Sequence, residues 1–201
     1  MTAIVGLDVA ASREAWERVG VRVADGVTWV GGVAIHFVEP EGGATGITGW
    51  RLSGSRQRPD TIDGLRTSHN DDESVESWTH PLGATAFDHV VVMTSSIERT
   101  CGAIESATGE PLKRVREAGP VRQGFHRLGP VIVEVVESSR VTDEVASFWG
   151  LVLVVDDIHD AAGRLGPDVI SYPRTAVQPG RLIASFREDA SLGLPVALMS
   201  R

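Results

Sequence analysis

The feature that most constrains this chain is an internal repeat: one strand, one short helix and three more strands can be followed three times along the sequence. The middle copy is the clearest. Its first strand is a β-branched run at 87–93, and its helix at 95–108 ends at Gly109. A strand at 112–117 follows the helix, and strands at about 121–128 and 131–137 close the copy. The chain is therefore predicted to be built from copies of one βαβββ module.

Two further copies flank the middle one. The third copy has its first strand at 148–155, followed by a helix that Asp156 or Asp157 can cap. The N-terminal copy is the shortest, with a strand at 4–9 and a helix that begins after Ser12. Strands and helices that alternate in this way predict an α+β fold.

The repeat also suggests how the chain divides. We expect an N-terminal degenerate βαβββ module at 1–54, a linker or lid at 55–85, and a two-module domain at 86–201, with modules at 86–138 and 146–201. The stretch between the first two copies is polar and acidic. Because so long a loop without structure is unusual inside one domain, a linker is preferred to a lid.

Composition excludes several functional classes. The formal charge of the 201 residues is −8, and Lys113 is the one lysine among 19 basic residues, which argues against nonspecific nucleic-acid binding. The single cysteine, Cys101, cannot form an intrachain disulfide. No apolar run approaches the length of a membrane span, and the N-terminus lacks a secretion signal. We therefore expect a cytoplasmic protein with no nucleic-acid and no membrane partner.

The second and third copies resemble a known family. The segment 87–94, the helix and strands after it, and the run 131–137 are similar to one module of the vicinal oxygen chelate superfamily, which includes glyoxalases and bleomycin-resistance proteins. The third copy repeats this pattern. The resemblance implies that the two modules pair into an open, eight-stranded glyoxalase-like β-cup with the active site inside. The additional N-terminal module could close against another chain, which would give a homodimer.

Enzymes of this superfamily bind a divalent metal through a His on the first strand and a Glu or His on the last strand of each module. Carried over by position, His89 and Glu134 match these two roles, with Zn, Ni, Mn or Fe as the implied metal. The third copy has Gly150 and Ala197 instead, and neither can supply a ligand. Alternatively, His89 is a histidine paired with a backbone or carboxylate group in the cup wall.

Two residues are candidates for catalysis. Glu134 interrupts an apolar strand, so its carboxylate must point to a wet or paired environment. His126 is the candidate for a third metal ligand or a general acid/base, because alternation places it on one face of a strand beside the Glu134 strand. The sequence leaves open whether that face is the cup.

Candidate substrate-binding residues come from a group of arginines and their polar neighbours. Six arginines lie on the strands of the middle copy or beside a loop of the third: Arg114, Arg116, Arg122, Arg127, Arg174 and Arg181. Most are expected to be solvated partners of acidic residues. We select Arg122 and Arg181, because each opens a strand beside a glycine or glutamine, as binding residues for an anionic group. Gln123, Gln178 and Trp149 complete the predicted binding site.

Two functions remain open at this point. The first is a glyoxalase-like small-molecule enzyme of the lyase or isomerase type, in which a metal held by His89 and Glu134 polarises vicinal oxygens of the substrate. The second is a metal-free protein of the same fold that binds or sequesters a small molecule. The number of metal ligands distinguishes them, because Gly150 and Ala197 replace two of the four expected positions.

Overall fold

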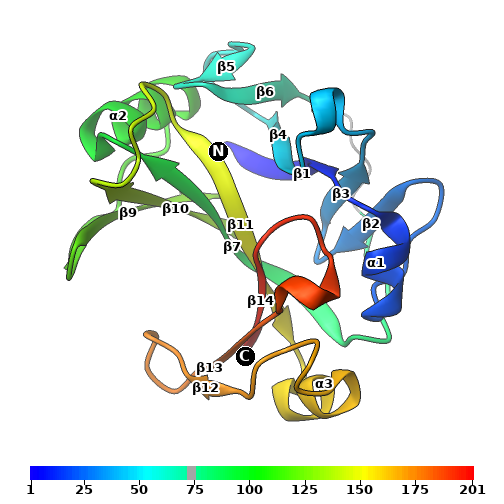
Figure 1. The fold of residues 1–201 in the computed structure, drawn as a ribbon. Coiled ribbons are helices and arrows are strands. Elements are labelled where there is room, and N and C mark those ends of the chain that lie inside the picture. Colours follow the sequence, from blue (N-terminus) through cyan, green and yellow to red (C-terminus); the bar gives the residue numbers. More distant parts are fainter. Residues whose placement is uncertain (72–75) are drawn as a thin grey trace.

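The computed structural model describes residues 1–71 and 76–201. These residues form two mixed β-sheets with few helices, which confirms the α+β class (Figure 1). The helices are α1 (Arg13–Arg18), α2 (Ile97–Thr108) and α3 (Ile158–Leu165). In the described part of the chain, no helix has the length and apolar character needed to cross a membrane.

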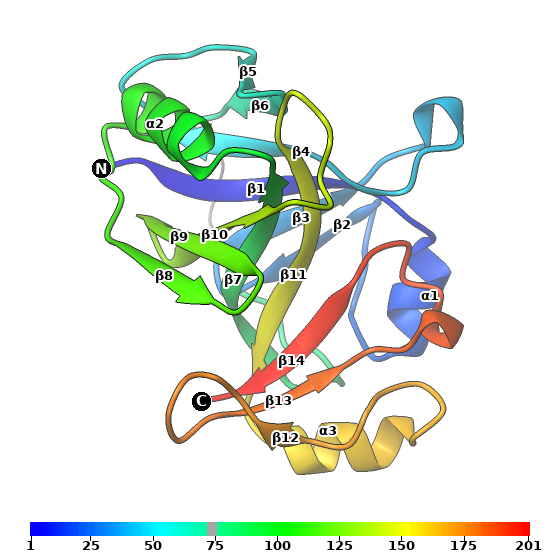
Figure 2. The ribbon, with the colours of Figure 1, turned by 60° about the vertical axis from the view of Figure 1, so that its left-hand side comes forward.

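The larger sheet has eight strands in the order β12-β13-β14-β11-β7-β10-β9-β8 (Figure 2). Its strands are β7 (Ala84–Thr94), β8 (Arg114–Ala118), β9 (Val121–Leu128), β10 (Val131–Ser138), β11 (Ser147–Val155), β12 (Arg174–Thr175), β13 (Leu182–Ser185) and β14 (Val196–Ser200). In each half the last strand runs parallel to the first, and the two first strands, β7 and β11, pair antiparallel at the centre. The two predicted modules therefore form one continuous sheet.

The smaller sheet has six strands in the order β2-β3-β1-β4-β6-β5. They are β1 (Ala3–Ala10), β2 (Val27–Val30), β3 (Val33–Phe37), β4 (Gly46–Ser53), β5 (Thr61–Ile62) and β6 (Leu65–His69). Strand β3 is parallel to β1, whereas β4 is antiparallel to β1 and parallel to β6. Strand β4 thus stands beside β1 as β11 stands beside β7, so this sheet repeats the larger one with one strand fewer in each half.

This topology corrects two expectations about the N-terminal region. Strand β4 does not close a βαβββ module at residue 54, because a closing strand would run parallel to the first strand. The segment 55–85 is not without structure, since it contributes β5 and β6, whose Ile62 and Leu65 side chains are buried. The division of the chain into domains stays a prediction.

The helix ends follow the sequence signals. The side chains of Ser12, Ser96 and Asp157 accept hydrogen bonds from backbone N–H groups in the first turns of α1, α2 and α3. Gly109 ends α2 in the left-handed conformation, with φ of 76°. These short local interactions explain why the predicted helix boundaries are nearly correct.

The two sheets share one apolar core. Leu7 and Trp50 of the smaller sheet belong to the same buried cluster as Val92 and Leu151 of the larger one. The Trp50 and Phe148 rings meet edge to face, with centroids 5.4 Å apart. Because this core and α2 cover one face of the eight-stranded sheet, its other face is left to form a cup.

Candidate functional site

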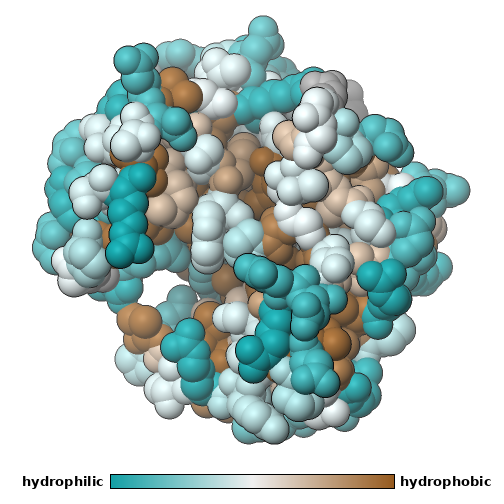
Figure 3. Space-filling view, in the orientation of Figure 1, coloured by the Kyte–Doolittle hydropathy of each residue, from teal (hydrophilic) through white to brown (hydrophobic). Residues whose placement is uncertain are grey.

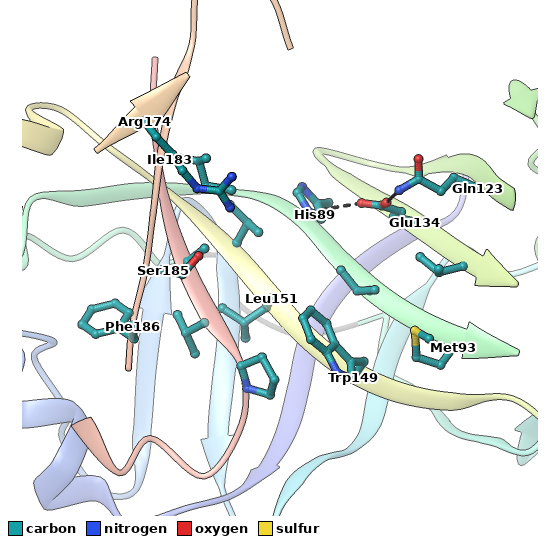
Figure 4. A pocket seen from close by; sticks show the side chains of 16 residues that line it. His89, Met93, Gln123, Glu134, Trp149, Leu151, Arg174, Ile183, Ser185 and Phe186 are labelled. Carbon is teal, nitrogen blue, oxygen red and sulfur yellow. Dashed lines mark hydrogen bonds and ion pairs between the residues drawn. The ribbon is translucent and has the colours of Figure 1, made fainter. Parts of the chain in front are cut away.

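The cup is a cavity of about 630 Å³ on the open face of the eight-stranded sheet (Figure 4). Most of its lining is apolar, and the polar side chains that line it are those of His89, Gln123, Glu134, Arg174 and Ser185. The apolar lining residues are Val91, Met93, Val136, Trp149, Leu151, Val152, Ile183, Phe186, Pro195, Val196 and Ala197. A cavity of this size and composition suits a small organic molecule.

Alternation along the strands decides which side chains reach the cup. On β7, His89, Val91 and Met93 line it, whereas Val90 and Val92 are fully buried in the core. On β10, Glu134 lines the cup between the buried Val133 and Val135. The predicted pair His89 and Glu134 therefore lies on the cup face of neighbouring strands.

The pairing of β7 with β11 has three register shifts, and two of them, near the cup, adjust this alternation. His89 and Phe87 pair with the consecutive residues Val152 and Leu153, so Asp88 is an extra residue on β7. In the same way Trp149 is extra on β11. A bulge changes the direction of a side chain relative to its neighbours, and here Asp88 contacts His89 while Trp149 lines the cavity.

A chain of polar contacts crosses the cup wall at His89. Its Nδ1 lies 2.8 Å from Asp88 Oδ2. Its Nε2 lies 3.3 Å from Glu134 Oε2 (Figure 4). Because a carboxylate only accepts, the proton on Nδ1 points to Asp88. The two contacts fix the imidazole ring with Nε2 directed at Glu134.

Further contacts hold both ends of this chain. The Arg181 guanidinium donates to Asp88 Oδ1, and its Nε donates to the Ser200 carbonyl at 2.7 Å. At the other end, Gln123 Nε2 donates to Glu134 Oε1, while Gln123 Oε1 accepts from Arg116 Nε at 2.9 Å. Glu134 is thus bonded at both oxygens.

The charge of Asp88 is set by its surroundings. The side chain is nearly buried, and burial alone would raise its pKa. Hydrogen bonds from His89 and Arg181 outweigh burial and hold the pKa at about 2. Asp88 is therefore a carboxylate at neutral pH and keeps the His89 ring oriented.

Four predicted binding residues lie at or beside the cup. Gln123 and Trp149 line the main cavity, and the Trp149 side chain is exposed there. Gln178 lines a smaller adjoining cavity and accepts a hydrogen bond from Arg181 Nη1 at 2.6 Å. The Arg181 guanidinium donates hydrogen bonds to Asp88 and Gln178. Arg181 therefore holds the Asp88 carboxylate in place.

Two predicted site residues point away from the cup. Arg122 and His126 share the face of β9 that packs toward α2, where a Cβ at Gly124 would lie only 2.8 Å from Cys101 Sγ. His126 is fully buried, and its Nδ1 lies 3.2 Å from the Glu110 carbonyl. His126 is not among the residues that line the main cavity, although it borders a smaller cavity that His89 and Glu134 also line. A general acid/base role for His126 therefore stays a prediction.

The structure also places Arg122, which was predicted to bind an anionic group of the ligand, away from the cup. Its guanidinium contacts Glu98 at 2.8 Å, Glu117 at 3.2 Å and Glu137 at 3.4 Å. Glu137 in turn accepts from the first N–H of α2, at Ile97. Arg122 therefore ties β9 to α2 on the side of the sheet opposite the cup.

The structure adds residues that the sequence did not select. Arg114, Arg116 and Arg174 line the cavity that adjoins the cup, and Asp88 orients His89. Arg116 pairs with Gln123 across the ladder, and Arg114 pairs with Phe125. Because paired residues face the same side of a sheet, the selection of Gln123 could have indicated that these arginines line the site as well. The Asp88 contact depends on a bulge, which the sequence does not signal.

The cup offers two side chains of the kind that bind metals. His89 Nε2 and the Glu134 carboxylate are ligand types that divalent metals accept. In residues 1–71 and 76–201, however, no group of three or more His, Cys, Asp and Glu side chains could hold a metal ion. Gly150 and Ala197 leave the other half of the sheet without a donor. The residues present therefore do not form a complete metal site.

The fold and the cup define a protein of the glyoxalase-like, or vicinal oxygen chelate, class of folds. No family model matches the sequence, and no curated protein matches it. Among solved structures, methylmalonyl-CoA epimerase from Mycobacterium tuberculosis is similar, with a TM-score of 0.50 and 14% identity over 59% of this chain and 89% of that one.

Two other structures lie near the same level of similarity. A variant of the Streptomyces coelicolor methylmalonyl-CoA epimerase in complex with 2-nitronate-propionyl-CoA has a TM-score of 0.47 and 18% identity over 58% of this chain and 97% of that one. A hypothetical protein from Bacillus halodurans has a TM-score of 0.48 and 13% identity over 57% and 93%. At 14% identity, the similarity to the Mycobacterium tuberculosis enzyme establishes the fold and not the activity.

Proposed function

We propose that this protein is a small-molecule isomerase of the glyoxalase-like type, in which His89 and Glu134 move a proton at a ligand held in the cup. The observation that carries the proposal is the contact of 3.3 Å between His89 Nε2 and Glu134 Oε2 at the wall of the cavity. Both side chains remain partly exposed there, at 13% and 14%. They are buried enough to be positioned and open enough to meet a ligand.

The contact itself implies a shared proton. Both atoms are acceptors when they carry no hydrogen, so their approach is favourable when one proton lies between them. With that proton on His89, Glu134 is a carboxylate that can take a proton from a ligand C–H group, and the C–H electrons move toward an adjacent carbonyl. The His89 Nε2–H then returns a proton to the ligand. The formula of the ligand is unchanged, as an isomerisation requires.

Asp88 and Gln123 support this step from either side. Asp88 holds the Nδ1 proton and stabilises the imidazolium, as a carboxylate does in other oriented histidines. Gln123 donates to Glu134 Oε1, which leaves Oε2 toward His89. No step in this scheme requires a metal, in agreement with the incomplete donor set.

The second candidate function is binding without catalysis. It is favoured by a different observation: both oxygens of Glu134 already have partners, and most of the cavity lining is apolar. A protein that only sequesters an apolar ligand would use the same cup. The two functions differ in whether Glu134 exchanges a proton with the ligand.

Hydrogen exchange in D₂O separates them. A panel of carbon acids, including methylmalonyl-CoA, substituted malonates and 2-oxo acids, would be incubated with the protein and followed by NMR. We expect exchange of one C–H proton in a panel member, and a loss of about 100-fold or more in Glu134→Gln. Glu144→Gln removes an exposed carboxylate outside the cup and should leave the exchange unchanged.

Two results would contradict the isomerase proposal. Exchange that persists in Glu134→Gln would place the reacting group elsewhere. A panel member that binds in the cup without exchange would favour the binding protein instead.

A further inference from the structure

The cup continues into a second, smaller cavity of different character. The large cavity of about 630 Å³ and the small one of about 210 Å³ share His89, Glu134, Gln123, Arg174 and Ile183, so they are two lobes of one site. The shared residues include the proposed proton-transfer pair. That pair therefore stands where an apolar lobe meets a basic one.

The basic lobe takes its charge from three arginines on two edge strands. Arg114 and Arg116 come from β8, and Arg174 comes from β12. These strands occupy equivalent positions at the opposite ends of the eight-stranded sheet. Figure 4 shows Arg174 on the other side of His89 from Glu134 and Gln123, so positive charge borders the site from both halves.

The three arginines of the basic lobe differ from those arginines that are held by carboxylates. Arg51, Arg122 and Arg181 each contact a carboxylate within the fold. Among the described residues, no ion pair is formed by Arg114, Arg116 or Arg174. Such pairs would be easy to form in a chain with 27 acidic residues. The lobe thus has three arginines against one carboxylate, that of Glu134, and an excess of positive charge.

Two of the three guanidinium groups are also held in place. Arg116 donates from Nε to Gln123 Oε1 at 2.9 Å, and the Arg114 guanidinium lies 4.9 Å from the centre of the Phe125 ring. Arg174 is exposed. Because a guanidinium binds carboxylate and phosphate groups through two parallel hydrogen bonds, a ligand anion is the natural partner of this lobe.

The apolar lobe provides the other half of the recognition. The Trp149 side chain is 52% exposed, which is unusual for a large aromatic residue. It lines the same lobe as Met93 and Phe186. Figure 3 shows that the surface is hollowed on the side of the molecule where the two halves of the eight-stranded sheet face each other. An apolar or aryl group in this hollow would cover the indole ring.

We propose that the ligand of the cup is an amphipathic organic anion, with its apolar or aryl body in the large lobe and its carboxylate or phosphate group against Arg174 and the β8 arginines. This inference rests on the proposed function only in taking the cup as the ligand site. It places the anionic group next to His89 and Glu134, so that the carbon beside the anion faces the proton-transfer pair.

Matched probes test the proposal by calorimetric titration. The probes are 3-phenylpropanoate, 2-phenylethyl phosphate and the neutral 3-phenylpropanamide. We expect the better anion to bind about 10-fold or more tightly than the amide, because one charge-assisted contact contributes about a factor of ten. The two anions distinguish a carboxylate site from a phosphate site.

Arginine variants locate the selectivity. Arg174→Gln should bring the anion and the amide to within about 3-fold of each other. Arg140→Gln makes the same charge change in the turn after β10, where Arg140 is exposed, and should keep the wild-type ratio. Circular dichroism of both variants checks that they are folded.

The outcomes separate this proposal from the isomerase proposal. Equal binding of anions and amide, an unchanged ratio in Arg174→Gln, or no binding of any probe would overturn the organic-anion ligand. Selective anion binding that is lost in Arg174→Gln supports it, whether or not the bound anion exchanges a proton. Absence of exchange in that case would count against the isomerase alone.

Discussion

The two halves of the eight-stranded sheet have the same topology and different chemistry. In the first half, His89 on β7 and Glu134 on β10 face the cup. Glu134 pairs with Val91, two residues after His89. In the second half, Ala197 pairs with Val152, two residues after Gly150. The ladder register therefore places Gly150 and Ala197 where the first half has its ionisable pair.

The difference shows that the repeat supplies a frame, while single side chains supply the function. The second half contributes much of the apolar lining, together with Arg174. The first half contributes the proton-transfer pair and two arginines. A site built in this way is asymmetric, and an asymmetric site can hold a ligand with unlike ends.

The largest expected effect concerns Gly150. A Cβ at this position would lie 2.4 Å from the Pro195 carbonyl oxygen, which is backbone and cannot easily move. Gly150→Ala should therefore lower the free energy of unfolding by about 3 kcal/mol, measured by urea denaturation. Gly163→Ala is the matched control, because no atom lies within 4 Å of its Cβ and alanine favours the helix. A Gly150→Ala protein as stable as wild type would show that this position could have carried a side chain.

A smaller effect is expected at Asp88. Its pKa is held at about 2, below the ordinary value of 3.8, so its contribution to stability is present above about pH 4 and is lost as the pH falls through about 2. Asp88→Asn should lower the free energy of unfolding by about 2 kcal/mol at pH 7 and by little at pH 2. Urea denaturation across this range measures the difference between the two proteins.

An exposed carboxylate provides the control for Asp88. Asp160 pairs with Arg164 within α3 at 2.9 Å, with both side chains at least half exposed. Asp160→Asn should change the free energy of unfolding by less than about 0.5 kcal/mol. If Asp88→Asn behaved like this control, the polar contacts of His89 would not depend on Asp88.

The smallest effect is expected from a substitution that makes the second half of the eight-stranded sheet resemble the first. Ala197→Glu places a carboxylate at the position that corresponds to Glu134, and it should tighten Zn²⁺ binding by about 10-fold in titrations with a competing chelator. Ala197→Gln adds the same bulk without the charge and should not. A wild-type protein that retains one metal per chain, and loses it in His89→Ala and in Glu134→Ala, would mean that two donors from one half suffice.

Much of the fold could be predicted from the sequence, because its signals are local. Ser96 and Gly109 delimit α2, and the β-branched run at β7 marks a strand, from interactions within a few residues. The N-terminal sheet was less predictable. Whether β4 runs parallel or antiparallel to β1 depends on a pairing between distant segments, which hydrophobic alternation does not reveal.

The candidate site was predictable only in part. His89 and Glu134 both follow from the resemblance, and Glu134 is also marked as a carboxylate on an otherwise apolar strand. For β9 the sequence shows that side chains alternate between two faces, but it does not show which of the two faces lines the cup. The structure assigns Gln123 and Phe125 to the cup, and Arg122 and His126 to the side of α2. Two of the predicted site residues were therefore on the wrong face.

By itself, the sequence determined the repeated strand–helix–strand pattern and the helix ends, since these depend on residue type and short spacing. Only the tertiary structure decided which strand faces form the cup. It also decided that a bulge brings Asp88 to His89, and that arginines from the two edge strands border the same cavity. These contacts join residues far apart in the chain, and their geometry is fixed by strand register and packing, which no local pattern encodes.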